Sequence, residues 1–194
     1  MNQTKKNDIL KELFNIGIGN ATIALNKIIG IPVMISIPEV FFIPIDEAIA
    51  KLEPLDKRVV SFYINITQGL SAGVLIIMDE NIAKHIVELT LKKEVNIDSK
   101  LFIDVLQEVL NILTSHFINT ISNLTKKRIL PGIPKYACDM EGAIVDVVFA
   151  EHQDKSLKVL FVTTELILKE AKKMSFILIP NEDSVTEILE SVCQ

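Results

Sequence analysis

Residues 8–25 read DILKELFNIGIGNATIAL, and residues 104–121 read DVLQEVLNILTSHFINTI. Each stretch has apolar side chains at the spacing of one helix face, which predicts an amphipathic helix packed on a core. Each also holds a glutamate three residues before an asparagine, as ELFN at 12–15 and EVLN at 108–111. Because these copies stand 96 residues apart in a chain of 194, we interpret them as a duplicated site.

The polar faces of the two predicted helices carry the candidate site residues, since side chains three or four apart share a helix face. On the first helix this face holds Asp8, Glu12, Asn15, Gly19, Thr22 and Asn26. On the later helix it holds Asp104, Glu108, Asn111, Ser115 and Ser122. Glycine costs a helix about 1 kcal/mol relative to alanine, so we expect Gly19 to serve the close approach of a partner's backbone.

The remaining pattern predicts an α+β fold with a largely antiparallel sheet, because short turns join the strands within each half. Helices are expected at about 7–29, 79–91, 101–127 and 181–192. Extended segments are expected at about 31–43, 57–67, 70–78, 134–138, 143–151, 157–165 and 174–179. Residues 44–54 are expected to form a loop with a short helical turn, and Gln68-Gly69 a tight turn.

A repeat of the element order predicts a single domain over residues 1–194, built from internal repeats at about 1–95 and 96–194. At an offset of 96, Leu10 corresponds to Leu106 and Ile16 to Ile112. At a later offset of 102, the strand 73–78 corresponds to 175–180.

Composition and charge exclude several classes of function. The net charge of −5 offers no basic footprint for a nucleic acid. The two cysteines show no paired spacing, and the three histidines lack the spacing of metal ligands, so no metal site is expected in this chain. The glycines of 17–22 follow a helix pattern and lack the third fingerprint glycine, so they do not predict a dinucleotide site.

The apolar stretch 28–45 resembles a membrane span in composition alone. Pro32, Pro38 and Pro44 interrupt it, and Glu39 lies near its middle. Prolines at this density break a helix and are tolerated in strand edges and bends. We expect extended structure there, no membrane insertion and a cytoplasmic protein, since residues 1–8 also lack the apolar region of a signal peptide.

The stretch 8–25 closely resembles the first signature of the CheC phosphatases of bacterial chemotaxis. That signature, Glu-x-x-Asn-Ile-Gly-x-Gly-x-Ala, is matched at every named position between Glu12 and Ala21. Residues 104–115 resemble the second signature more loosely, because Leu113 and Ser115 stand where that motif has glycines. The resemblance covers essentially the whole chain. It implies a duplicated α/β fold in which the two signature helices lie on the same face of one sheet.

This resemblance implies a phosphatase that removes the phosphoryl group from an aspartate of a CheY-like response regulator in two-component signalling. Glu12 and Glu108 would be the catalytic partners of the regulator's lysine, and Asn15 and Asn111 would orient the attacking water. Asp8, Gly19, Asp104 and Ser115 would contact the regulator. No cofactor of the chain's own is implied, and Mg²⁺ is expected in the regulator.

Alternative functions remain open on the sequence. CheC-like proteins also bind CheD, a receptor-modifying deamidase, and related domains serve in the flagellar switch, so a non-catalytic adaptor is the second hypothesis. Because the sequence stops at Gln194, we expect no appended switch domain of the FliY kind. A response regulator outside chemotaxis is a third option. We expect a monomer, because the repeat already supplies an internal pair.

Overall fold

The computed structural model describes residues 3–30, 34–35, 39–52, 54–151, 158–168, 170–180 and 182–192. The first seven elements are α1 (Gln3–Ile29), β1 (Met34–Ile35), β2 (Glu39–Pro44), α2 (Ile45–Ala50), β3 (Arg58–Gln68), β4 (Ala72–Asp79) and α3 (Glu80–Leu91). The next seven are α4 (Lys100–Thr125), β5 (Leu130–Pro131), β6 (Lys135–Met140), α5 (Glu141–Ala150), β7 (Lys158–Leu168), β8 (Glu170–Pro180) and α6 (Glu182–Val192). Both sets run helix, strand, strand, helix, strand, strand, helix. The division into repeats at 1–95 and 96–194 stays a prediction.

The sheet has the strand order β1-β7-β8-β4-β3-β5, with β2 also paired to β7 and β6 to β3. Every described pairing is antiparallel. The central pair is β4 with β8, in which Leu75 is opposite Ile177. The predicted α+β class and the predicted antiparallel sheet are therefore confirmed.

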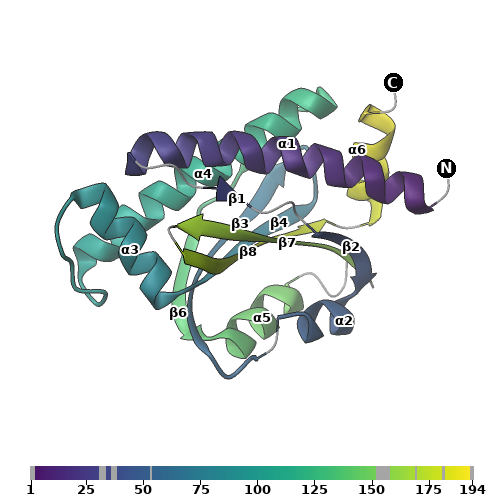
Figure 1. Ribbon diagram of the computed structural model, residues 1–194. Helices are drawn as coiled ribbons and strands as arrows, with labels where there is room; N and C mark the ends of the chain where they lie inside the picture. Colours follow the sequence, from purple (N-terminus) through teal and green to yellow (C-terminus); the bar gives the residue numbers. More distant parts are fainter. Residues whose placement is uncertain are drawn as a thin grey trace.

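Both faces of the central strands are buried. Alternate residues of β3 point to opposite faces, as strand geometry requires: Phe62 and Ile64 join the larger core cluster, and Val59 and Tyr63 the smaller one. In Figure 1, α1 and α4 lie on one side of the sheet and α2 and α5 on the other. The two motif helices thus share one face, as predicted.

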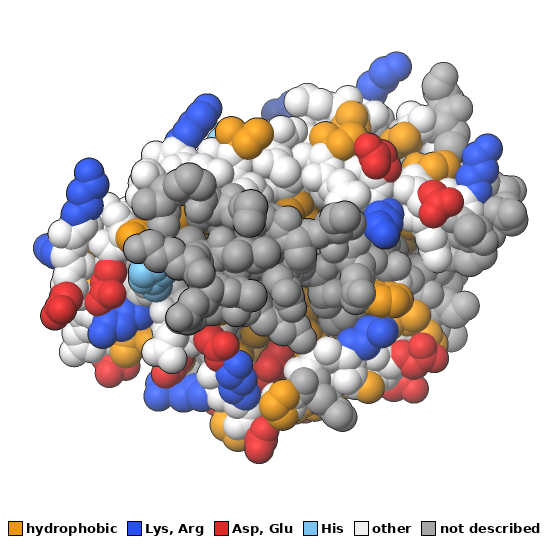
Figure 2. All heavy atoms as spheres, viewed as in Figure 1, with side chains coloured by type: hydrophobic (Ala, Val, Ile, Leu, Met, Phe, Trp, Pro, Cys, Tyr) orange, Lys and Arg blue, Asp and Glu red, His pale blue; other side chains and the backbone are white. Residues whose placement is uncertain are grey.

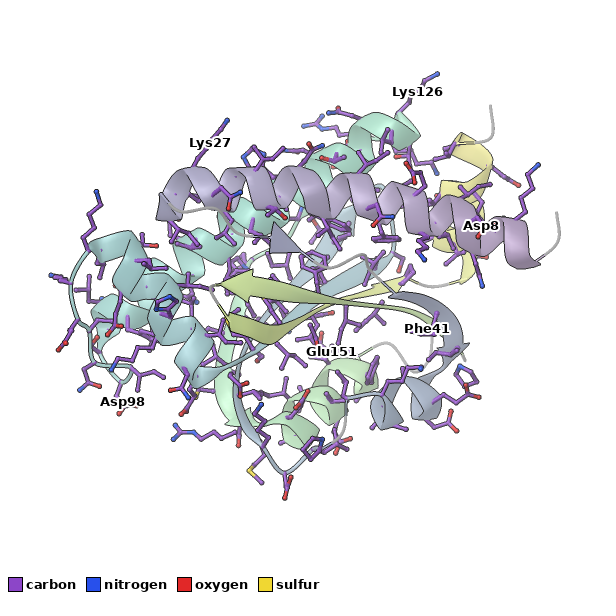
Figure 3. All side chains as sticks on the ribbon, viewed as in Figure 1. Asp8, Lys27, Phe41, Asp98, Lys126 and Glu151 are labelled. Atoms are coloured by element: carbon purple, nitrogen blue, oxygen red, sulfur yellow. The ribbon has the colours of Figure 1, made fainter. Side chains whose placement is uncertain are left out.

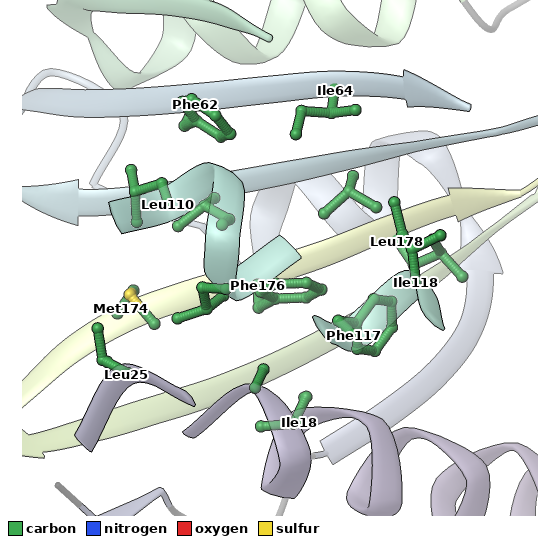
Figure 4. Packing of buried hydrophobic residues seen from close by; sticks show 14 of the residues in the cluster. Ile18, Leu25, Phe62, Ile64, Leu110, Phe117, Ile118, Met174, Phe176 and Leu178 are labelled. Atoms are coloured by element: carbon green, nitrogen blue, oxygen red, sulfur yellow. The ribbon is translucent and has the colours of Figure 1, made fainter. Parts of the chain in front are cut away.

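The larger core lies between the sheet and the four helices α1, α3, α4 and α6. Phe117 of α4 is at its centre, with its ring centroid 5.5 Å from that of Phe14 on α1 and 4.7 Å from that of Phe176 on β8. Figure 4 shows Phe117 beside Phe176, with Ile18 of α1 nearby. Burying one such aromatic side chain stabilises the fold by about 1.5–3 kcal/mol. This packing holds α1 and α4 in fixed positions.

Residues 141–150 form helix α5, so the strand predicted at 143–151 is wrong. The run EGAIVDVVFA is rich in β-branched residues, which favours strand on propensity alone. In α5, however, Ile144, Val145, Val148 and Phe149 are buried against the second face of the sheet. The spacing of these four residues matches one helix face, and packing on the sheet overrides the local preference.

Helix α4 is the one helix, among the residues that the structure describes, that is long and apolar enough to cross a membrane by length and composition. Eleven of its side chains are buried, including Phe102, Leu106 and Phe117. Its N-terminus is capped by Ser99, whose Oγ accepts a hydrogen bond from the Phe102 amide at 3.2 Å. The apolar composition of α4 is that of the central core helix.

The turn between β3 and β4 is at Gln68-Gly69, as predicted, and Gly69 has φ +90°. A Cβ on Gly69 would also lie 2.2 Å from the Arg128 carbonyl oxygen. Both the positive φ and this close contact therefore require glycine at this position. The N-terminus of α3 has no side-chain cap. Asp79 occupies the N-cap position, yet its carboxylate pairs with Lys57 at 2.5 Å and makes no capping bond.

Candidate active site on the paired helices

The four predicted catalytic residues lie on the outer faces of α1 and α4. Glu12 and Glu108 are exposed, and Asn15 and Asn111 are half-buried. The neighbouring residues Leu13 and Val109 point inward and are buried in the core. Each pair therefore has the same exposure pattern in both copies, set by a helix whose other face is anchored in the core.

The flanking residues of the predicted site follow the same pattern. Asp8 and Asp104 are exposed, Gly19 is exposed, and Ser115 is half-buried. Two other residues predicted on these faces have local roles instead. Thr22 is buried and donates a hydrogen bond to the Ile18 carbonyl at 2.7 Å, so its predicted place on the polar face is wrong. Ser122 donates to the Lys127 carbonyl where α4 ends.

Helices α1 and α4 run side by side in opposite directions. In Figure 3, Lys126 just after α4 lies toward the same end as Asp8 near the start of α1, whereas Lys27 lies at the other end. Asn20 of α1 donates a hydrogen bond to the Thr120 hydroxyl of α4 at 3.1 Å, which marks where the helices meet. Measured from this contact at 1.5 Å of rise per residue, Asn15 and Asn111 lie about 20 Å apart along the helix pair.

The structure therefore brings Glu12 beside Asn15, and Glu108 beside Asn111, but keeps the two pairs apart. Within the described ranges, no hydrogen bond or ion pair holds any of these four side chains. An exposed carboxylate and amide on a rigid helix can bind a cation or ammonium group and a water, respectively. Each pair therefore has the carboxylate, the amide and the access to solvent expected of half an active site. The other half would come from another molecule.

The two glycines of the first motif have different structural roles. A Cβ on Gly17 would lie 2.9 Å from two ring carbons of Phe117, so this glycine permits the close packing of α1 on α4. A Cβ on Gly19 would meet nothing within 4 Å. Packing within the chain therefore explains Gly17 and leaves Gly19 without a structural reason, and the predicted role of Gly19 in partner approach stays a prediction.

The sequence reasoning missed a groove of about 470 Å³ between α1 and α4. Its walls include Ile23, Lys27, Ile112 and His116, and Ile23 is 54% exposed. Figure 2 shows hydrophobic side chains at the surface on the side of the molecule formed by α1 and α4, among charges of both signs. No sequence signal could locate the groove, because it depends on how two helices almost a hundred residues apart pair.

Titratable groups with shifted pKa values lie on the β3–β6 edge of the sheet. Burial, then a hydrogen bond to Glu80, raises the pKa of the Cys138 thiol, whose Sγ is 3.3 Å from Glu80 Oε1. Burial, then the charge of Glu151, raises the pKa of Tyr63. Within the described ranges, no three His, Cys, Asp or Glu side chains gather as a metal site requires.

Comparison with known proteins finds distant similarity in sequence and close similarity in fold. No family model matches the chain. The CheY-P phosphatase CheC of Bacillus subtilis (strain 168) is 23% identical over 189 residues, which cover 93% of this chain and 90% of that protein. The crystal structure of Thermotoga maritima FliY has a TM-score of 0.78 at 18% identity, covering 100% of this chain and 98% of FliY. The chain is thus similar in sequence to CheC and has the fold of the CheC/CheX/FliY superfamily.

The same fold is found in FliM. The FliM middle domain from H. pylori has a TM-score of 0.69 at 12% identity, covering 98% of this chain and 99% of that domain. At such identities the likeness concerns the fold alone. A CheC/CheX/FliY fold can therefore carry different functions, and the exposed residues of α1 and α4 must decide between them.

Proposed function

We propose that the chain is a cytoplasmic phosphatase that accelerates hydrolysis of the phospho-aspartate of a CheY-like response regulator in chemotaxis. The observation that carries this proposal is that α1 and α4 alike present an exposed glutamate and a half-buried asparagine, neither of which has a partner in the described part of the chain. The distant relationship to a CheY-P phosphatase supports the same conclusion.

In the proposed mechanism, this chain supplies positioning groups. The amide of Asn15 or Asn111 enters the regulator's site and holds a water in line with the phosphorus–oxygen bond to the aspartate. The water oxygen bonds to phosphorus as that bond breaks, which releases phosphate and a free carboxylate. Positioning and electrostatics supply most of the catalysis in phosphoryl transfer, so no nucleophile of the chain's own is required.

The carboxylate of Glu12 or Glu108 pairs with a lysine of the regulator and so fixes the orientation of the neighbouring asparagine. Such a charge-assisted contact adds geometric specificity. Mg²⁺, expected in the regulator, would stabilise charge on the phosphoryl oxygens when bound. Asp8, Gly19, Asp104 and Ser115 are proposed to contact the regulator around each pair.

The second candidate is a non-catalytic adaptor, either in the flagellar switch or bound to a CheD-like deamidase. The observation that favours a switch role is the likeness to FliY and to the FliM middle domain. An adaptor requires neither Asn15 nor Asn111 as such. The two candidates therefore differ in what the loss of these amides would do.

The test is phosphate release from a phosphorylated CheY-like regulator. We expect the wild type to accelerate release and Asn15→Ala/Asn111→Ala to return it to the rate of the regulator alone. Asn81→Ala removes an exposed amide from α3 instead and should leave the rate unchanged. No acceleration by the wild type would contradict the enzyme function and favour the adaptor.

A further inference from the structure

The groove between α1 and α4 lies between the two Glu-x-x-Asn pairs. Four pairs of lining residues stand 96 residues apart in the sequence: Asn20 and His116, Ile23 and Asn119, Ala24 and Thr120, and Lys27 and Asn123. The hydrogen bond between Asn20 and Thr120 lies in its wall. Since both helices contribute corresponding residues, the groove belongs equally to both halves of the helix pair.

The groove also lies close to both candidate sites along the helices. Ile112 lines it and directly follows Asn111, while Asn20 lines it one and a half turns beyond Asn15. No carboxylate is among its lining residues, which include Lys27 and His116. It therefore suits a protein surface with apolar groups and hydrogen-bond acceptors, and the flanking Glu12 and Glu108 suit a lysine.

The spacing of the two pairs is smaller than the footprint of a protein partner. A specific interface covers about 800 Å² on each partner, which corresponds to a disc roughly 32 Å across. The two asparagines lie about 20 Å apart along the helix pair, and α1, with 27 residues, is only about 40 Å long. Two discs of this size, each centred on one asparagine, overlap on the groove.

We propose that the groove is the shared centre of both docking footprints, so that the chain binds one response regulator at a time, at either pair. This inference rests on the proposed function and adds a stoichiometry to it. A regulator docked over Glu12 and Asn15 covers Ile23 and so blocks the approach of a second regulator to Glu108 and Asn111. The two sites are alternatives.

The first test measures the mass of the complex by light scattering during size-exclusion chromatography. The probe is a CheY-like chemotaxis regulator held in its phosphorylated form by beryllofluoride and added in excess. We expect one regulator per chain for the wild type, for Asn15→Ala and for Asn111→Ala. Two regulators per wild-type chain would overturn the inference and leave the phosphatase function standing. No complex, together with no phosphate release, would overturn both.

The second test asks whether both pairs use the groove. Ile23→Glu places a charge at a side chain that is 54% exposed, so the fold should be kept, as circular dichroism and the melting temperature will show. We expect it to lower phosphate release at least tenfold in both the Asn15→Ala and the Asn111→Ala background. A loss confined to one background, or a loss of self-association of this chain without any loss of regulator binding, would overturn the shared footprint.

A matched control is available on the other side of the sheet. Val147 of α5 is 64% exposed, and α5 packs against the face opposite α1 and α4. Val147→Glu introduces the same charge at a similarly exposed position and should leave phosphate release and the one-to-one stoichiometry unchanged. An equal loss in Val147→Glu would mean that the effect of Ile23→Glu is not specific to the groove and would overturn the assignment.

Discussion

Helices α1 and α4 have the same motif residues on their outer faces but different residues on the inner faces that pack in the core. Glu12 and Asn15 match Glu108 and Asn111 in identity and exposure. Where the helices meet, α1 has the small residues Gly17 and Ala21, while the corresponding positions of α4 hold the large Leu113 and Phe117, all four buried. Small residues on one helix make room for large ones on the other.

This difference changes how the second motif is interpreted. The replacement of a signature glycine by Leu113 concerns packing, since Leu113 is only 2% exposed and Gly17 already provides the close approach. The replacement of Gly19 by Ser115 lies on the outer face and concerns the partner. The second site therefore departs from the first at one outward position, so we predict that both sites work.

The largest expected effect on stability comes from removing the large side chain of α4 where the two helices meet. Phe117→Ala deletes a side chain that is 1% exposed and stacks on Phe14. It should lower the free energy of unfolding by about 3–5 kcal/mol, because a cavity remains in a packed core. Urea denaturation followed by circular dichroism measures this. A loss below 1 kcal/mol would contradict the central role of Phe117.

The next largest effect on stability is expected when α1 receives the residue that α4 has at the corresponding position. Gly17→Leu drives a side chain into the Phe117 ring and should cost about 1–3 kcal/mol of unfolding free energy through overpacking. In the Phe117→Ala background the same substitution should cost less, or should stabilise, because the cavity can accept it. Equal costs in both backgrounds would show that the small and large residues are not coupled.

A smaller effect is expected at the outward glycine. Gly19→Ala should raise the free energy of unfolding by about 0.5–1 kcal/mol, because alanine has the higher helix propensity and its Cβ would meet no other atom. Gly19→Trp should keep the fold but weaken binding of the beryllofluoride-activated regulator to the Asn111→Ala variant, which retains only the first pair. Calorimetric titration gives the affinity, and unfolding by Gly19→Trp would count against the open surface.

The smallest effect is expected at the corresponding position of α4. Ser115→Gly should cost about 0.5 kcal/mol of helix stability and should raise phosphate release in the Asn15→Ala background, where only the second pair remains. The same substitution in the Asn111→Ala background serves as the control. A rise in the control, or a fall in the test background, would refute the interpretation of Ser115.

The sequence predicted those features that depend on local patterns. Helices α1 and α4 follow from their apolar spacing, and the turn at Gly69 follows from its dipeptide, so both were placed within a few residues. The α+β class followed from the strand turns, since antiparallel neighbours need only short connections. The exposure of Glu12 and Asn15 on one helix face was predictable for the same reason.

Features that depend on contacts between distant segments were not predicted. Helix α5 resembles a strand by composition. It forms a helix because its apolar residues pack against the second apolar face of the sheet. One signal was present: β4 reads AGVLIIMD, and a strand that is apolar on both faces needs cover on both sides. The groove and the role of Gly17 had no such signal, because each arises from the pairing of α1 with α4.

The central claim is that α1 and α4 each present a working half-site. The most direct measurement is the rate of phosphate release from one phosphorylated regulator in the presence of wild type, Asn15→Ala, Asn111→Ala and the double variant. We predict that each single variant keeps a substantial part of the acceleration, and that the double variant gives the rate of the regulator alone. A double variant as active as the wild type, or a single variant that already abolishes the acceleration, would contradict the account.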